Sequence, residues 1–152
     1  MSPEQRSDFV ERFARMLEET GHSRIAGRIF AHLATADEPY LSQQDLVEQL
    51  QVSAASVSTN TRQLIVMNLL TRVAVPGSRR EHYALIPDGS RRAAELAVRN
   101  ARRVAALADE GLALLPDTVS AGTQSLRAMR ETYTGMASAI ESVVVEPLRI
   151  AQ

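Results

Sequence analysis

The sequence contains no cysteine among its 152 residues. Disulfide bonds, thiolate catalysis, thiol redox sensing and sulfur ligands for zinc are therefore excluded. Enzyme motifs are also missing, because there is no Gly-rich phosphate loop, no His-Glu-x-x-His and no nucleophile elbow. Imidazole chemistry could come only from His22, His32 and His82. We therefore expect a protein that is not an enzyme and has neither a cofactor nor a metal site.

Long apolar runs are missing as well. No window approaches the ~18 consecutive apolar residues of a transmembrane helix. The first residues, Met1 to Arg6, lack the apolar core of a signal peptide. The sequence therefore predicts a soluble, cytoplasmic protein. Its length and 45% apolar content suit one globular unit with an appendage.

Lysine is absent too, and the 17 basic residues, all arginine, are unevenly distributed. The net charge is -1, yet residues 53–103 hold nine arginines against three acids. Residues 1–52 hold five arginines against nine acids, and residues 104–152 hold three against six. A basic middle between acidic flanks suits a polyanion-binding face, since an acidic remainder limits indiscriminate binding. A merely solvated charged surface is the alternative that composition leaves open.

Two helices are predicted ahead of the basic segment. Apolar residues at helical spacing indicate an amphipathic helix over Pro3–Thr20, which ends at Gly21. A second helix is expected from Ile25 to the break at Asp37-Glu38-Pro39. Gly27 within it indicates a close contact between helices.

A helix-turn-helix is predicted at the start of the basic segment. Ser42 stands three residues before Asp45, which is the capping-box spacing, and Ser53 can cap a second helix after a tight turn. On this second helix Val57 and Leu64 share one face, from which most small and polar residues point away. A helix of this kind reads bases in the major groove with side chains near its N-terminus.

A β-hairpin is predicted next. Leu70–Val75 and Glu81–Leu85 can pair as antiparallel strands, with Pro76-Gly77 as the central pair of a type II turn. Arg79 and Arg80 then form a cationic tip that can reach a minor groove or its phosphates. Strand alternation favours Arg79 as the DNA contact and Arg80 as a brace of the wing. The alternative that one of these arginines forms an ion pair with Glu81 remains open.

The predicted DNA contacts lie on these elements. Ala55 and the Thr59 methyl group allow close approach to a thymine methyl, and Arg62 can bind phosphate or guanine. Helix capping is the competing explanation for Ser53 and Ser56. The full predicted set is Ser42, Ser53, Ala55, Ser56, Ser58, Thr59, Arg62, Gln63, Ser78, Arg79 and Arg80.

Two long helices are predicted after the hairpin, separated at Pro116-Asp117. Apolar residues alternate at spacings of three and four along both. On the first, this seam comprises Ala93, Ala97, Asn100, Val104, Leu107, Gly111 and Leu114. A seam this long needs a partner helix, and a second copy of the chain is favoured over packing within the monomer. The predicted dimer interface comprises Phe9, Phe13, Val104, Leu107, Leu126, Met129, Tyr133, Met136, Ile140 and Val143.

These residues resemble the MarR superfamily, and most closely its GbsR-like branch. The resemblance runs through Gly21–Phe30, Leu41–Leu46, Ser53–Leu64 and Pro76–Tyr83. It implies a regulator, for which we expect repression, acting as a homodimer with winged units on successive major grooves of a pseudo-palindrome. Effector binding between the parts is common in the superfamily but not universal. MarR-type wings often carry an acid between basic residues, whereas here the order is Arg79-Arg80-Glu81, so the residue that enters the groove stays open.

The expected fold is mainly α with a small β-hairpin wing. Residues 1–37 are predicted as N-terminal helices for dimerisation and support, 38–87 as the winged helix-turn-helix, and 88–152 as long dimerisation helices. The expected partners are double-stranded DNA, a second copy and a small-molecule effector, with no membrane. Phe13, Met16 and Phe30 can line an effector pocket, although core packing explains them more simply. A winged-helix module used only for protein interaction is the alternative function.

Overall fold

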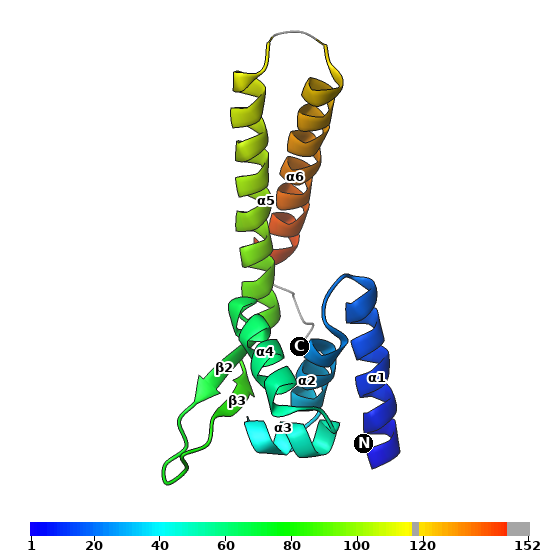
Figure 1. Cartoon of the computed structure of the whole chain (residues 1–152), viewed down its shortest axis with the longest axis vertical. Coiled ribbons are helices and arrows are strands. Elements are labelled where there is room, and N and C mark those ends of the chain that lie inside the picture. Colours follow the sequence, from blue (N-terminus) through cyan, green and yellow to red (C-terminus); the bar gives the residue numbers. More distant parts are fainter. Residues whose placement is uncertain (117–118, 146–152) are drawn as a thin grey trace. The chain divides into compact units, whose positions relative to one another are not determined.

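The structure is a computed structural model that describes residues 1–116 and 119–145 (Figure 1). Asp117, the predicted start of the last helix, and residues 146–152 of the predicted C-terminal segment lie outside this description. The chain divides into two compact units, Met1–Ser90 and Arg91–Gln152, called here the N-terminal and the C-terminal unit. The described residues are mainly helical and include one small antiparallel sheet, so the predicted fold class is confirmed. No described helix is long and apolar enough to cross a membrane.

Two antiparallel helices begin the N-terminal unit, α1 (Pro3–Glu19) and α2 (Arg24–Ala34) (Figure 1). The Ser2 hydroxyl accepts a hydrogen bond from the Gln5 amide at 3.2 Å and so caps α1. The two helices approach so closely that a Cβ atom on Gly27 would lie 2.7 Å from the Cα atom of Ala14. The predicted close helix contact at Gly27 is therefore confirmed.

The winged helix-turn-helix follows within the same unit. Helices α3 (Gln43–Leu50) and α4 (Ala54–Val66) precede strands β2 (Leu70–Val73) and β3 (His82–Leu85). The sheet has the order β1-β3-β2, because a short strand β1 (Leu41–Ser42) pairs antiparallel with β3. Strand β1 was not predicted. It contains only two residues, and its partner lies forty positions further along the chain.

One hydrophobic core joins these elements. Its most buried side chains come from α2, α3, α4 and both hairpin strands. They are Ile29, Leu46, Val57, Leu64, Leu70 and Tyr83, none of which is more than 1% exposed. Burial of an aliphatic side chain contributes about 1.5–3 kcal/mol to stability. This core therefore holds helix α4 and the β2–β3 hairpin in fixed positions.

The C-terminal unit contains α5 (Gly89–Leu114), whose first two residues belong to the N-terminal unit, and α6 (Ala121–Val145). The described side chains that are buried here are small: Val98, Ala101, Ala105, Ala108, Thr123 and Ala137. Ala97, Asn100 and Leu107 of the predicted α5 seam are exposed, so these residues do not pack against α6, and the pairing of this seam with a second copy stays a prediction. Apolar residues occupy two neighbouring faces of α5, and the smaller ones form the intrachain contact.

The predicted interface residues of α6 divide between two faces. Leu126, Tyr133 and Ile140 are half-buried, and Tyr133 and Ile140 pack against the small core of this unit. By contrast, Met129 is 42%, Met136 47% and Val143 73% exposed. On α5, Leu107 is 63% exposed and Val104 half-buried. The hairpin of two helices thus leaves a stripe of large apolar side chains uncovered within the described chain.

Candidate DNA-binding surface

The helix-turn-helix is fixed by side-chain caps. The Ser42 hydroxyl accepts a hydrogen bond from the Asp45 amide at 3.1 Å, and the Asp45 carboxylate accepts one from the Ser42 amide at 2.8 Å. This is the predicted capping box. Hydrogen bonding of the Asp45 carboxylate by the side chain and the backbone amide of Ser42 holds the pKa of Asp45 below its ordinary value. Ser53 caps α4 as predicted, because its hydroxyl accepts from the Ser56 amide at 3.1 Å.

The turn between α3 and α4 brings the start of α4 against α3. Gln51 ends α3 with a left-handed backbone, at a φ of 52°. The side-chain amide of Gln43 donates a hydrogen bond from Nε2 to the Ala54 carbonyl at 3.2 Å across the turn. These contacts hold the first turn of α4, where a recognition helix meets bases.

One face of α4 is polar and exposed. Ala55, Thr59, Arg62 and Gln63 are exposed. The opposite face is buried, and its polar residues bond back to the helix: the Asn60 amide donates to the Ser56 carbonyl and the Thr61 hydroxyl to the Val57 carbonyl, both at 2.8 Å. The division of α4 into a buried and an outward face is as predicted.

Most serines of the predicted contact set form local side-chain hydrogen bonds. Ser42 is only 2% exposed, and its hydroxyl serves the capping box. The Ser53 hydroxyl donates to the Ser56 hydroxyl at 3.0 Å. Ser58 and Ser78 are half-buried, and the Ser78 hydroxyl accepts from the Arg80 amide at 3.2 Å. Ser42 is therefore buried beneath the candidate DNA-binding surface. The other serines are half-buried, except Ser53, which is exposed.

The wing turn has the predicted geometry. The Ser78 amide donates to the Val75 carbonyl at 3.1 Å, and Gly77 has a φ of 80°, as the third residue of a type II turn requires. Arg79 and Arg80 are both exposed beyond this turn. Within residues 1–116 and 119–145, neither guanidinium forms an ion pair. The wing tip therefore carries two cations available to a polyanion.

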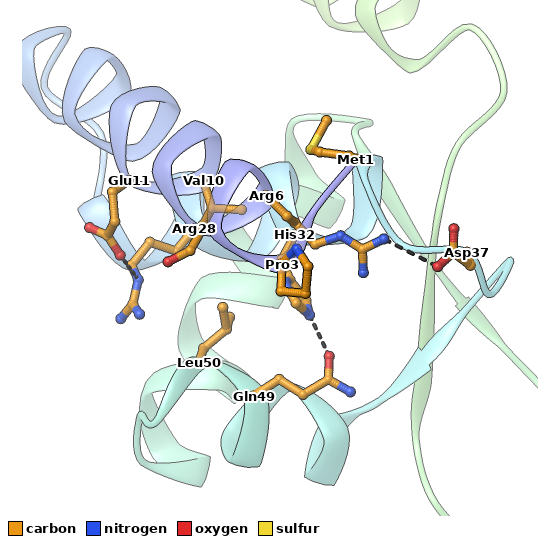
Figure 2. A pocket seen from close by; sticks show the side chains of 11 residues that line it. Met1, Pro3, Arg6, Val10, Glu11, Arg28, His32, Asp37, Gln49 and Leu50 are labelled. Carbon is orange, nitrogen blue, oxygen red and sulfur yellow. Dashed lines mark hydrogen bonds and ion pairs between the residues drawn. The ribbon is translucent and has the colours of Figure 1, made fainter.

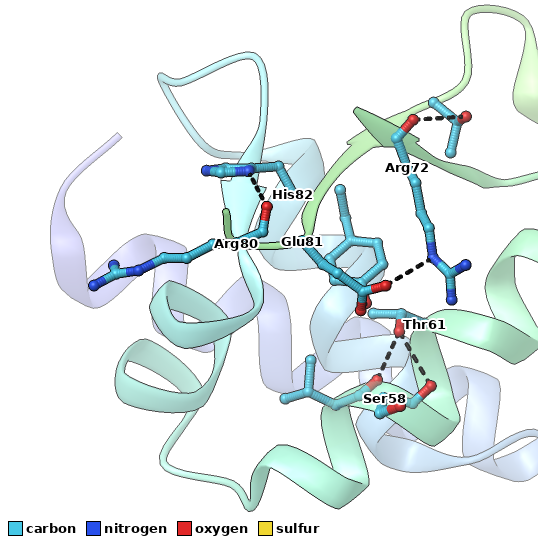
Figure 3. A network of polar contacts seen from close by, with 9 residues as sticks. Ser58, Thr61, Arg72, Arg80, Glu81 and His82 are labelled. Atoms are coloured by element: carbon cyan, nitrogen blue, oxygen red, sulfur yellow. Dashed lines mark hydrogen bonds and ion pairs between the residues drawn. The ribbon is translucent and has the colours of Figure 1, made fainter. Parts of the chain in front are cut away.

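Glu81 pairs with neither tip arginine, so the ion pair that the sequence left open as an alternative does not form. Its Oε1 atom lies 3.5 Å from Nε of Arg72 on β2, and its Oε2 atom accepts a hydrogen bond from the Tyr83 hydroxyl at 2.9 Å. Figure 3 shows the Arg80 side chain pointing away from Glu81, which faces Arg72. The strand register explains this choice, because Arg72 lies opposite Tyr83.

Tyr83 joins this group to the recognition helix. The residue is only 1% exposed, and burial raises the pKa of its hydroxyl, which also contacts the Thr61 hydroxyl. Thr61 belongs to the inner face of α4. Arg72, Glu81 and Tyr83 therefore form a polar chain in the wing, and its tyrosine hydroxyl lies beside Thr61 of α4. Arg72 was absent from the predicted contact set. Only the pairing register of the two hairpin strands places it near Glu81, and no local sequence motif indicates this.

Of the predicted effector-pocket residues, Phe13 and Phe30 pack on one another. The rings of Phe13 and Phe30 stack at 5.4 Å, Phe9 lies 6.0 Å from Phe13, and Met16 is 45% exposed. A cavity of about 340 Å³ lies elsewhere in the N-terminal unit, among α1, α2 and α3, and none of these residues lines it. The effector pocket therefore stays a prediction.

That cavity has a mixed polar and apolar wall (Figure 2). The side chains of Val10 and Leu50 line it. Ion pairs and a hydrogen bond form the polar side: Arg6 with Asp37 at 3.2 Å, Arg28 with Glu11 at 2.7 Å, and His32 with Gln49. Among the described residues, no group of three or more His, Asp or Glu side chains could hold a metal ion.

Comparison with known proteins agrees with this architecture. The model of the MarR family matches residues 20–81, which include the helix-turn-helix and most of the wing. The HTH-type transcriptional regulator MmpR5 of Mycobacterium tuberculosis (strain ATCC 25618 / H37Rv) is 32% identical over 141 residues, which are 93% of this chain and 83% of that protein. The chain belongs to the MarR family.

A solved structure supports the fold of this MarR family protein. The crystal structure of a transcriptional regulator is 29% identical to it, with a TM-score of 0.81. The similarity covers 93% of this chain and 96% of that one. The chain is therefore a winged helix-turn-helix transcriptional regulator of the MarR family, and no enzyme motif accompanies that fold. Its placement in the GbsR-like branch stays a prediction.

Proposed function

We propose that the protein is a cytoplasmic repressor that binds a pseudo-palindromic DNA operator as a homodimer. The observation that carries this proposal is the pairing of two exposed features in the N-terminal unit. Helix α4 presents Thr59, Arg62 and Gln63 outward, and the wing tip presents Arg79 and Arg80 without ion-pair partners in the described chain. A helix with exposed polar side chains beside a positively charged wing tip suits duplex DNA. Contacts with phosphates supply affinity, and contacts with base edges supply specificity.

The two elements have different roles in this proposal. Arg62 and Gln63 can hydrogen-bond to base edges or phosphates, and Ala55 and Thr59 leave room for close approach to the groove. Arg79 contacts the minor groove or its phosphates. Ser42 has the capping role alone, because it is buried. Ser53, Ser56, Ser58 and Ser78 can add phosphate contacts at the edges.

Dimerisation supplies specificity that one copy lacks. Helix α4 has few long polar side chains, so one unit can distinguish only a few base pairs. Two copies held at a fixed spacing read two half-sites. The uncovered side chains Leu107, Met129, Met136 and Val143 support a second copy as the partner, because exposed apolar helix stripes are commonly covered by symmetric association. Phe9 and Phe13 of α1 are also among the residues proposed to contact the second copy.

Repression follows from occupancy, because a dimer bound across an operator excludes other proteins from it. The cavity among α1, α2 and α3 offers a second candidate place for a small-molecule effector (Figure 2), since its volume of about 340 Å³ lies within the usual range of ligand pockets. An effector bound there would contact α3, which packs on α4.

The test starts with selection of genomic fragments on the purified protein. Operator retention is then compared for wild type, Arg62→Ala/Arg79→Ala, and the control Arg12→Ala, which removes an exposed ion pair with Asp8 on α1. The double variant should bind at least about tenfold more weakly, with a log–log salt slope shallower by about 1.8, because each lost phosphate contact accounts for about 0.9. Equal retention by the double variant would contradict the assignment.

The same titration separates DNA binding from a role limited to protein interaction. A DNA-binding dimer loses affinity steeply as salt rises, because each neutralised phosphate releases counterions. A protein-interaction module would retain no operator at any salt concentration.

A further inference from the structure

Arg72 differs from the tip arginines in having a weak partner. Its Nε atom lies 3.5 Å from Oε1 of Glu81, and its side chain remains 59% exposed. Exposed ion pairs of this length contribute little to stability, because water screens the two charges. The other carboxylate oxygen of Glu81 accepts a hydrogen bond from the Tyr83 hydroxyl at 2.9 Å. Glu81 is therefore fixed on one side, while the arginine on its other side is easily released.

The position of this pair matters because it lies between the two proposed DNA-binding elements. Arg72 is on β2, and Glu81 stands between the wing tip and β3. The Tyr83 hydroxyl, which donates to Glu81, lies beside Thr61 of α4. In the proposed complex, a DNA strand that runs from the groove occupied by α4 to the wing tip would pass over this part of the hairpin. Its phosphates would meet the exposed guanidinium of Arg72.

We infer that Arg72 is a further phosphate-binding residue and that Glu81 holds and neutralises it until DNA displaces the carboxylate. This inference rests on the proposed DNA-binding function. A phosphate brings full negative charge to Arg72 and can accept two of its N–H groups at once, which the single 3.5 Å approach of Glu81 does not achieve. The exchange involves no covalent step. Its cost is the loss of one weak, solvent-screened ion pair.

Two variants give opposite expectations. Arg72→Ala should weaken operator binding about three- to tenfold at 0.1 M KCl and make the salt slope shallower by about 0.9. Glu81→Gln should strengthen binding by a similar factor, because it removes a carboxylate that competes with phosphate. The glutamine Oε1 atom can still accept the Tyr83 hydrogen bond, so the fold should persist. A thermal melt checks that point.

Two further variants serve as controls. Arg72→Lys keeps the charge, so it should retain most of the affinity and the full slope, as expected for a phosphate contact. Asp8→Asn releases an arginine in the same way, because Asp8 pairs with Arg12 at 3.0 Å on α1. That arginine lies on a helix outside the proposed DNA surface. Asp8→Asn should therefore leave operator affinity unchanged.

The experiment is fluorescence anisotropy of the selected operator, titrated with each variant of the full chain at several KCl concentrations. Weaker binding by Glu81→Gln with an unchanged slope would show that the pair only shapes the wing, and would overturn the inference. Unchanged affinity and slope in Arg72→Ala would overturn it as well. If the wild type itself binds no duplex, the proposed function fails. If it binds and only the Arg72 and Glu81 variants disagree, this inference alone fails.

Discussion

The two units of the chain differ in what they bury. The core of the N-terminal unit contains isoleucine, leucine and tyrosine side chains at 1% exposure or less, including Ile29, Leu64 and Tyr83. In the described part of the C-terminal unit, the largest buried side chain is valine at Val98, and Leu107 and Met136 are 63% and 47% exposed. The N-terminal unit has a complete core within one chain. The C-terminal unit leaves several of its large apolar side chains exposed within the described chain, and we propose that a second copy covers them.

This difference assigns a role to each unit. A packed core holds the recognition helix and wing at fixed positions, as a sequence-reading surface needs. An uncovered apolar stripe is unfavourable in a monomer and favourable in an interface. We therefore propose that the N-terminal unit carries the DNA contacts and that the C-terminal unit carries most of the dimer interface.

The largest expected effect comes from opening the N-terminal core. Leu64→Ala should lower the free energy of unfolding by about 2–5 kcal/mol, because truncation leaves a cavity in a packed interior. Val66→Ala on the same helix is the matched control. Val66 is 70% exposed, so its truncation should change stability by about 0.5 kcal/mol or less. Urea unfolding followed by circular dichroism measures both. Equal losses would mean that this core is less complete than the structure indicates.

A smaller effect is expected at two helical glycines with opposite surroundings. An added Cβ at Gly27 would lie 2.7 Å from the Ala14 backbone, whereas nothing lies within 4 Å of one at Gly135 in α6. Gly27→Ala should therefore destabilise by about 1–3 kcal/mol through overpacking. Gly135→Ala should stabilise by about 0.5–1 kcal/mol through helix propensity. Thermal melts should move in opposite directions, and a loss at both positions would weaken the contrast between the units.

The smallest effect concerns pH. The hydrogen bonds from Ser42 lower the pKa of Asp45 in the folded protein. The stabilisation by Asp45 is therefore present above its unfolded pKa of about 4 and is lost as pH falls through the lower folded value. Asp45→Asn should lower the Tm at pH 7 by a few degrees and reduce the fall in Tm on acidification. An unchanged pH profile in this variant would show that the α3 cap contributes no such dependence.

The sequence predictions were accurate where a feature depends on residues close together in the sequence, and less accurate where it depends on residues far apart. Ser42, Ser53 and the Pro76-Gly77 turn were predicted correctly, because caps and turns depend on residues within three or four positions. Strand β1 and the Arg72–Glu81 pair were missed, because both depend on the register between distant or facing strands. On α5 the apolar periodicity predicted a long helix, but apolar residues on two adjacent faces hid which face packs against α6.

The contact residues on DNA, the dimer interface and the effector site belong to a second class. Arg62 and Arg79 are exposed where a duplex could reach them, yet exposure alone assigns no partner. Each of these contacts involves a second molecule, such as DNA, another copy of the chain or an effector. The periodicity of the sequence and the structure of one chain therefore do not identify them. Binding experiments decide these assignments.

Sedimentation equilibrium tests the contrast between the units most directly. Met129→Asp/Met136→Asp places charges on the uncovered stripe, and Gln124→Asp/Ser138→Asp places them at exposed polar positions of the same helix. Wild type and the control should sediment at twice the 16.6 kDa of one chain. The stripe variant should sediment as a monomer, with N-terminal stability retained. A monomeric wild type, or a stripe variant that remains dimeric, would contradict the account.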